Sequence, residues 1–250
     1  MRLIRNIAVF CIVITSFACS GLRKSEKTPK ESIVKVTTSM GEMYIELSDK
    51  TPKHKANFLK LAKEGFYDST LFHRVIGGFM VQGGDPQSKG AKPGKALGNG
   101  GPGYTIPAEF NTTLFHKKGA LAAARMGDNV NPKKNSSGSQ FYLVQGKKYT
   151  VEQLKALEIQ KRNTEPGWNM ESVKGFKFSK AQLEAYTTVG GTPFLDAGYT
   201  VYGQVIKGLD VIDKIAKVAK DKQNRPNKDV MMKMEVLQLS AKEKMKLLEK

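Results

Sequence analysis

The sequence is short of cysteine and of long apolar runs, and both shortages exclude whole classes of protein. It has two cysteines among 250 residues, too few for a disulfide-linked scaffold or for a zinc site built from several cysteines. Its one long apolar run lies at the very start, which excludes a protein with several membrane spans. With 40% hydrophobic and 26% charged residues, the chain has the composition of an ordinary globular protein.

Acidic residues are also scarce relative to basic ones. Lysine and arginine number 41 and aspartate and glutamate 23, so the formal net charge is +18. Such an excess suggests a nucleic-acid partner or an anionic membrane surface. However, no run of basic residues is longer than two, and no aromatic stripe accompanies them. We therefore interpret the excess as a solvated, lysine-rich surface and predict no nucleic-acid partner.

The first 32 residues have the layout of a targeting segment. Arg2 and Arg5 precede the apolar stretch 7–17, as in an export signal. The stretch ends in SFAC, which resembles the lipobox of bacterial lipoproteins, with Cys19 at the lipidated position. An ordinary signal cleaved near Ala18 is the alternative. We predict a signal peptide over 1–18, a lipid-anchor tether over 19–32, and a membrane-anchored lipoprotein of the cell envelope that faces the periplasm.

The remaining chain carries many short segments of alternating hydrophobicity and two helical patterns. Thr51 as an N-cap and Pro52 at the first helical position predict a helix over 52–64, and a second is predicted over 208–219. A hairpin is predicted over 33–47, and further strands over 71–76, 79–83, 119–124, 140–145, 199–206 and 230–239. This pattern predicts a closed, mainly antiparallel β structure.

Residues 147–192 differ from this pattern. They contain helical pieces at 150–162 and 179–187, and they end in Gly190-Gly191. We interpret them as an insertion that either gates or extends a neighbouring binding groove or is a surface excursion without a role there. The last segment, 241–250, is predicted to be a charged tail that forms a short exposed helix.

Three patterns suggest other chemistry, and each lacks a required part. Residues 98–103 have the glycine spacing of a dinucleotide-binding loop, but Pro102 has no N–H and no helix follows. Ser139 has no nucleophile elbow around it, so we interpret it as a structural hydroxyl rather than a nucleophile paired with His73. The histidines are isolated from one another, so we predict no metal site; they are His54, His73 and His116.

Five motifs stand in a recognisable order along the chain. They are FHRVIGGFMVQGGD (72–85), GNGGPGYTIPAEF (98–110), GALAAAR (119–125), SSGSQFYLV (136–144) and FLDAGYTVYGQV (194–205). Together they resemble the cyclophilin family of peptidyl-prolyl isomerases. The resemblance implies a closed eight-stranded antiparallel β-barrel capped by two α-helices, here over 33–240 with the partly helical insertion 147–192. It also implies that no cofactor is needed.

The resemblance assigns the central role to Arg74. A guanidinium is always charged and carries a rigid fork of donors, which suits the stabilisation of a twisted prolyl bond. The family's proline pocket corresponds to Phe79, Met80, Tyr142 and Leu195. Hydrogen bonds to the peptide are implied for Gln82 and Gln140, and contacts with the substrate backbone for Ala124 and Arg125.

Two positions depart from many eukaryotic family members. Phe194 stands where these carry tryptophan, and Tyr199 where they carry histidine. Because phenylalanine lacks the indole N–H, we predict weak inhibition by cyclosporin. The implied substrates are proline-containing segments of exported polypeptides. The protein itself is predicted to be a monomer. A chaperone or scaffold that binds proline segments with only incidental turnover is the alternative.

Overall fold

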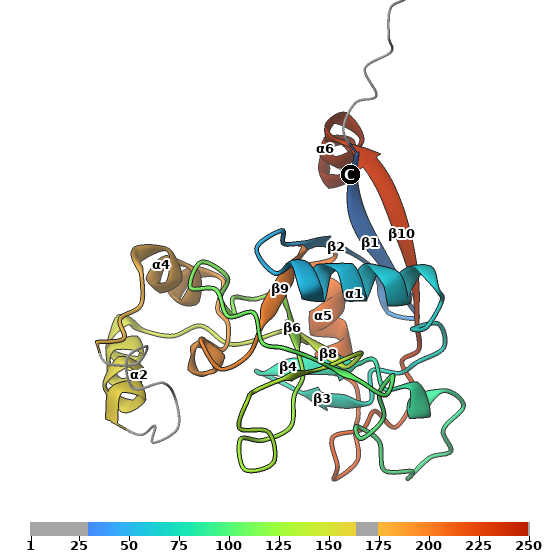
Figure 1. Ribbon diagram of the computed structural model, residues 1–250, viewed down its shortest axis with the longest axis horizontal. Coiled ribbons are helices and arrows are strands. Elements are labelled where there is room, and N and C mark those ends of the chain that lie inside the picture. Colours follow the sequence, from blue (N-terminus) through green and yellow to red (C-terminus); the bar gives the residue numbers. More distant parts are fainter. Residues whose placement is uncertain (1–29, 164–174, 250) are drawn as a thin grey trace, which may run out of the picture.

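The computed structural model describes residues 30–163 and 175–249 (Figure 1). The predicted signal peptide, Cys19 and most of the predicted tether lie outside these residues. Eight strands form one antiparallel sheet in the order β10-β1-β2-β9-β6-β8-β4-β3. In that order they are Met232–Ser240, Lys30–Thr38, Gly41–Leu47, Val201–Lys207, Ala120–Ala123, Phe141–Val144, Met80–Gly83 and Arg74–Ile76. A separate pair joins β5 (Thr105–Ile106) to β7 (Ser136–Ser137).

The prediction of a closed barrel is not confirmed, because β3 and β10 remain the two ends of the sheet. The segments that precede them meet at one isolated bridge, Leu71–Met231, supported by a hydrogen bond from Phe72 N to Val230 O (3.0 Å). β3 itself is only three residues long, and its Val75 N donates to Asn224 O of a loop (2.8 Å). Val75 at the free edge of β3 is therefore bonded to this loop and not to β10.

The two predicted capping helices are confirmed. α1 runs over Pro52–Lys63 and α5 over Leu209–Ala216. Thr51 occupies the N-cap position of α1, but its side chain makes no capping hydrogen bond. The Glu109 carboxylate caps the helix instead, because it accepts from Lys53 N (3.1 Å) and His54 N (3.0 Å). A residue distant in sequence thus supplies the cap that was predicted to be local.

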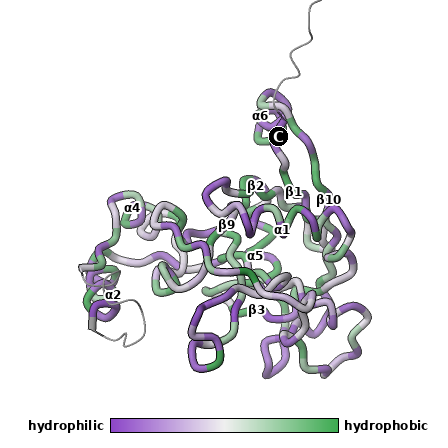
Figure 2. Tube along the Cα trace, viewed as in Figure 1, coloured by the Kyte–Doolittle hydropathy of each residue, from purple (hydrophilic) through white to green (hydrophobic). Residues whose placement is uncertain are grey.

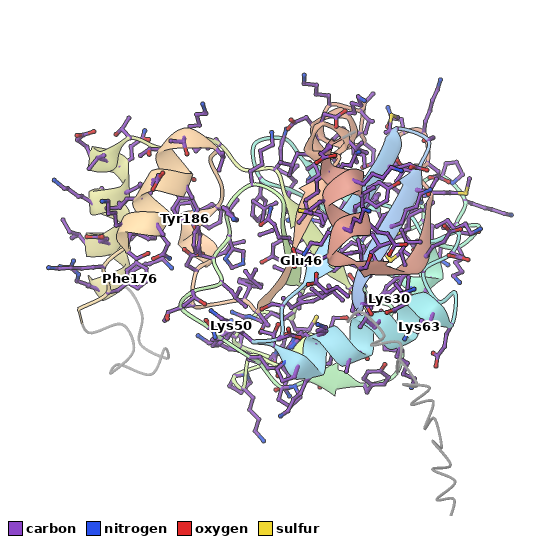
Figure 3. The ribbon with its side chains drawn as sticks, turned by 90° about the horizontal axis from the view of Figure 1, so that it is seen from above. Lys30, Glu46, Lys50, Lys63, Phe176 and Tyr186 are labelled. Carbon is purple, nitrogen blue, oxygen red and sulfur yellow. The ribbon has the colours of Figure 1, made fainter. Side chains whose placement is uncertain are left out.

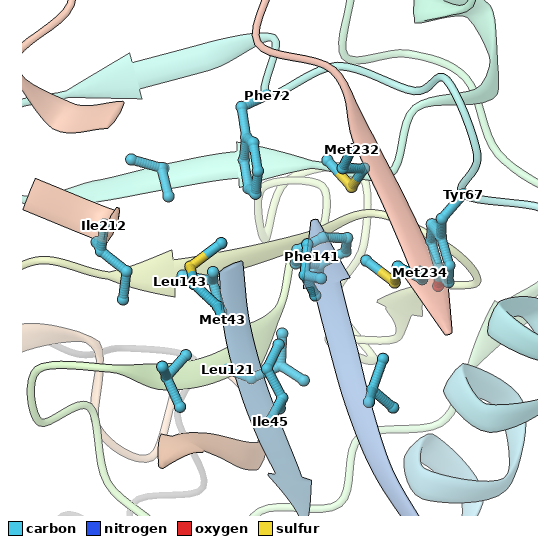
Figure 4. Close-up of a cluster of buried hydrophobic side chains, with 14 of the residues drawn as sticks. Met43, Ile45, Tyr67, Phe72, Leu121, Phe141, Leu143, Ile212, Met232 and Met234 are labelled. Carbon is cyan, nitrogen blue, oxygen red and sulfur yellow. The ribbon is translucent and has the colours of Figure 1, made fainter. Parts of the chain in front are cut away.

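The two faces of the central strands serve different purposes. Alternate residues such as Val81, Phe141 and Leu143 point into the main core together with Ile212 of α5 (Figure 4). The residues between them, including Met80 and Tyr142, form a second buried cluster on the opposite face. Figure 2 shows hydrophobic residues gathered around the central strands and α5, with hydrophilic residues in the outer loops. The second face is the one that carries the candidate site.

Both ends of the described domain come together at one edge of the sheet. β1 begins at Lys30, and residues 30–32 pair with 238–240 of β10, so these three residues belong to the sheet and not to the predicted tether. The tail forms α6 (Ala241–Glu249) beside the start of β1 (Figure 1). Lys244 fixes it by ion pairs to Glu31 and Glu46, each 2.7 Å long.

The insertion forms a lobe of its own beside the sheet. It contains α2 (Val151–Asn163) and α4 (Lys180–Thr188), followed by the short helix η2 (Pro193–Leu195). Figure 3 shows Tyr186 and Phe176 in this lobe, on the far side of the molecule from Lys63. Leu154, Phe178 and Tyr186 make its small apolar core. None of the helices within residues 30–163 and 175–249 combines the length and apolar character that a membrane span requires.

Candidate active site

Strand register places the predicted site residues in one row across the sheet. Arg74 of β3 pairs with Gln82 of β4, Gln82 pairs with Tyr142 of β8, and Tyr142 pairs with Ala122 of β6. Directly paired residues in a sheet project from the same face. Three motifs that are far apart in the sequence therefore bring their side chains to one surface.

A chain of hydrogen bonds fixes the guanidinium of Arg74. Its Nη1 donates to Gln82 Oε1 (3.1 Å), and Gln82 Nε2 donates to Gln140 Oε1 (3.0 Å). Gln140 Nε2 donates in turn to the carbonyls of Gly98 (2.9 Å) and Gly100 (2.7 Å). Because carbonyls only accept, the amide nitrogen of Gln140 must face Gly98 and Gly100, and its oxygen must face Gln82. Gln82 therefore turns its amide nitrogen to Gln140 and its amide oxygen to Arg74.

The glycine-rich loop 98–103 is therefore part of the site's support, a role that the sequence analysis missed. A side chain at Gly100 would collide with the carboxylate of Asp85. That carboxylate is buried and accepts from Gly98 N (2.5 Å) and Gln87 N (2.7 Å). The loop thus needs a glycine at position 100 so that Asp85 can hold it and its carbonyls can hold Gln140.

Beside Arg74 lies a pocket of about 110 Å³. Nine of the eleven predicted catalytic and substrate-binding residues line it: Arg74, Phe79, Met80, Gln82, Ala124, Arg125, Tyr142, Leu195 and Tyr199. The other two lie next to it. Gln140 is buried behind Gln82, and Phe194 is 45% exposed at the rim with its ring 5.5 Å from that of Phe79. The sequence-predicted residues therefore come together as one site.

Ala124 and Arg125 form one wall, and their backbone groups differ in availability. Ala124 N donates to Gln140 O (3.0 Å), and its carbonyl accepts from Ser137 N (2.8 Å). Within the described part of the chain, the backbone N–H and carbonyl of Arg125 make no hydrogen bond. The Arg125 guanidinium is occupied, since it donates to Gly198 O (2.8 Å) and lies over the Tyr199 ring at 4.4 Å. Of Arg125, the guanidinium is thus engaged, while the backbone groups are not, within the described residues.

The floor of the pocket is Tyr142, whose hydroxyl is buried. Burial raises the pKa of Tyr142 well above its usual value, so the phenol stays protonated. Its oxygen lies 3.0 Å from His116 Nε2, and His116 Nδ1 lies 2.8 Å from Asp196 Oδ1. Sequence reasoning left His116 without a role and did not single out Asp196. The FLDAG motif was the available signal, since Asp196 directly follows the pocket residue Leu195.

Other chemistry finds no support in the described residues. Ser139 is buried, and its hydroxyl donates to Gly84 O (2.8 Å), which is the structural role predicted for it. Over residues 30–163 and 175–249, no three His, Cys, Asp or Glu side chains gather as metal ligands would. Burial lowers the pKa of His73, next to Arg74, below its usual 6.5, so its imidazole is neutral at pH 7.

The site is thus a small pocket of mixed polar and apolar lining beside one oriented guanidinium, on a mainly antiparallel sheet. The family described as cyclophilin type peptidyl-prolyl cis-trans isomerase/CLD matches residues 33–236. The chain belongs to this family.

Relatives and solved structures agree with this assignment. A "Putative peptidyl-prolyl cis-trans isomerase" of Staphylococcus epidermidis is 36% identical over 196 residues, which cover 78% of this chain and 86% of that protein. A "Putative bifunctional phosphatase/peptidyl-prolyl cis-trans isomerase" of Streptococcus pyogenes is 37% identical over 80% of this chain, but the match spans only 37% of that longer protein. A cyclophilin-type isomerase of Cryptosporidium parvum shares the fold, with a TM-score of 0.55 and 23% identity over 84% of this chain and 98% of that one. A second crystal structure of that protein was obtained in the presence of the dipeptide Ala-Pro.

Proposed function

We propose that this protein catalyses cis-trans rotation of X–Pro bonds in polypeptides, with Arg74 as the catalytic residue. The observation that carries the proposal is the Arg74 guanidinium, held by Gln82 at the edge of a pocket of about 110 Å³. Rotation needs no covalent chemistry, and its barrier of about 18–20 kcal/mol arises from the loss of amide resonance in the twisted state. A catalyst must bind that state better than either planar isomer.

Arg74 can supply this preference through electrostatics. When resonance fails, the prolyl nitrogen regains a lone pair that accepts a hydrogen bond. A donor aimed beforehand at that position stabilises the twisted state without reorganisation of its own. The chain of amides from Gly98 and Gly100 through Gln140 and Gln82 holds the guanidinium in place before substrate arrives.

The remaining pocket residues would hold the peptide. Phe79, Met80, Tyr142 and Leu195 offer an apolar surface to the proline ring. The backbone groups of Arg125, which make no hydrogen bond within the described residues, could pair with the substrate backbone on the adjacent wall. With the proline ring and the neighbouring backbone held, Arg74 is placed to act on the bond that rotates, which favours catalysis over simple capture by a chaperone.

The proposal extends to location and substrate. The signal-like residues 1–18 and the lipobox-like SFAC support export and lipidation at Cys19, and hence a domain tethered to a membrane and acting on exported polypeptides that fold slowly at proline. Changing Cys19 to serine should then move the protein from the membrane fraction to the soluble fraction. Retention in the membrane by the C19S variant would contradict a lipid anchor at this residue.

The activity is tested by a proline-peptide isomerisation assay on the full chain and on two matched variants, Arg74→Lys and Arg162→Lys. Both exchanges keep the charge but remove a planar fork, and Arg162 lies on α2 outside the pocket. We expect Arg74→Lys to lower kcat/KM by about 10²- to 10³-fold and Arg162→Lys to leave it unchanged. Wild type without turnover would contradict the enzyme, and equal effects of the two exchanges would contradict the role of Arg74.

A further inference from the structure

The insertion is joined to the pocket floor by a continuous set of buried polar contacts. Tyr142 contacts His116, and His116 contacts Asp196, as described above. The second carboxylate oxygen of Asp196 accepts from two side chains of α4, the Tyr186 hydroxyl (2.5 Å) and Gln182 Nε2 (2.9 Å). All five side chains belong to residues that are 7% exposed or less. The path therefore runs from the insertion to the proline pocket without passing through solvent.

The chemistry of Asp196 fixes the direction of the bonds that its carboxylate accepts. A carboxylate only accepts, so His116 Nδ1 carries a proton and donates it to Asp196. His116 Nε2 shares the remaining hydrogen bond of the ring with the Tyr142 hydroxyl. Among residues 30–163 and 175–249, the Asp196 carboxylate has four donors: Tyr186, Gln182, His116 Nδ1 and the backbone N of His116 (2.9 Å). Two of the four come from α4 of the insertion, so the insertion is needed to satisfy a buried charge next to the pocket.

A second contact holds the pocket wall from the outside. Lys161 of α2 donates to the carbonyls of Phe194 (3.1 Å) and Asp196 (2.7 Å), at either side of Leu195. Phe194 and Leu195 belong to the short helix η2, and Asp196 is its C-cap residue. This segment places Leu195 in the pocket and Phe194 at the rim. α2 thus ties down the segment on which both side chains are mounted.

The base of the insertion is rigidly joined to the same segment. Gly191 exchanges backbone hydrogen bonds with Lys147 (3.0 and 3.2 Å), and Thr192 N donates to His116 O (2.8 Å). A side chain at Gly191 would collide with the His116 carbonyl, so the close approach requires glycine. The two chain ends of the insertion are therefore clamped together within contact of His116.

From these contacts we infer that the insertion 147–192 is a brace for the proline pocket. Tyr186 and Gln182 act as positioning residues for Tyr142 through Asp196 and His116, and Lys161 acts as a positioning residue for Leu195. The inference rests on the proposed function, because the pocket it braces is the one assigned to proline. It gives the described part of the insertion a role that connects it to the groove, namely support of the pocket floor and wall.

Exchange of Tyr186 for phenylalanine is the sharpest test, with Tyr149→Phe as its matched control. Both tyrosines pack in the small core of the insertion. Only the Tyr186 hydroxyl contacts Asp196, and the Tyr149 hydroxyl has no hydrogen bond within the described residues. Each full-length variant is compared with wild type in kcat and KM for a proline peptide, in thermal unfolding and in the ¹⁵N signals of its three imidazoles.

We expect Tyr186→Phe to lower kcat/KM by about 2- to 30-fold and to shift the imidazole signal of His116, while Tyr149→Phe changes neither. A second variant, Lys161→Met, keeps the apolar stem and should raise KM more than it lowers kcat, because it loosens a wall that binds substrate. Wild-type kinetics and an unmoved His116 signal in Tyr186→Phe would overturn the brace. So would equal losses in both tyrosine variants that simply follow their unfolding temperatures.

The brace and the proposed function fail in different ways. If wild type is inactive, or if Arg74→Lys has no effect, the proposed function fails. If wild type is active and sensitive at Arg74 but indifferent to Tyr186→Phe and Lys161→Met, only the brace fails.

Discussion

Exchange of Gln140 for glutamate should damage both the fold and the catalysis, because Gln140 is 5% exposed and its amide nitrogen serves two carbonyls. Gln140 Nε2 now lies 2.9 Å from Gly98 O and 2.7 Å from Gly100 O. In the ionised glutamate variant, a carboxylate oxygen would take the place of this nitrogen and face both carbonyl oxygens. Each buried acceptor left without a donor costs about 1–3 kcal/mol. We therefore expect a loss of about 2–6 kcal/mol in the free energy of unfolding at pH 7.

Catalysis should fall as well, because Gln140 orients Gln82 and Gln82 orients Arg74. A guanidinium displaced by about 1 Å is expected to lower kcat/KM by about 10- to 100-fold. The carboxyl introduced by Gln140→Glu could, when protonated, again donate to one carbonyl, so the folded state would raise its pKa. The part of the stability that depends on this proton would then be present below the unfolded pKa and lost as pH rises through the folded pKa. The deficit of the variant relative to wild type should therefore shrink toward acid pH.

Gln204→Glu is the matched control, since Gln204 Nε2 also donates to two backbone carbonyls, those of Lys118 (3.0 Å) and Val205 (3.3 Å), but does not line the proline pocket. Chemical denaturation and isomerase assays on both variants separate the two effects. Gln204→Glu should lose stability and keep kcat/KM among the molecules that remain folded. If Gln140→Glu keeps wild-type kcat/KM, or if both variants lose activity equally, the chain of amides does not position Arg74.

Two further predictions concern the rim of the pocket and a buried histidine. Phe194 is 45% exposed and lacks an indole N–H. Wild type should therefore resist cyclosporin, and Phe194→Trp should be inhibited more strongly. Nanomolar inhibition of wild type in the isomerase assay would contradict this expectation. Burial lowers the pKa of His73 below 6.5, so the unfolded state binds more protons, and stability that is present above pH 6.5 is lost as pH falls through the folded pKa. His73→Phe should therefore reduce the slope of unfolding free energy against pH between 6.5 and 5 by up to about 1.4 kcal/mol per pH unit. Denaturant titration measures this slope. An unchanged slope would show that His73 is not the titrating group.

The elements of the domain could be predicted from the sequence because their signals are local. Pro52 and the apolar spacing that follows it place α1 at Pro52–Lys63, within a residue of the predicted 52–64. The strand candidates, the two helical pieces of the insertion and the short helix of the tail all form near their predicted positions. Alternation with period two and helical spacing depend only on neighbouring residues, so they are visible without the fold.

The list of pocket residues could also be predicted, since nine of eleven line one cavity. What the motifs could not give is the way these residues support one another. The row from Arg74 through Gln82 to Tyr142 depends on register, and register is set by pairing between strands that are distant in the sequence.

Three features were decided only by tertiary contacts. Glu109, and not Thr51, caps α1 because the loop that carries Glu109 packs across the helix start. The sheet order ends at β3 and β10, and the free edge of β3 bonds to a loop at Asn224 and not to β10. The insertion gains its relation to the pocket from Asp196, which is buried and must collect donors from whichever elements pack around it. Sequence by itself thus determined the family, the elements and the pocket's members, since these follow from local pattern and motif. The tertiary structure alone decided how that pocket is held, because a buried charge is satisfied by proximity in space and not along the chain.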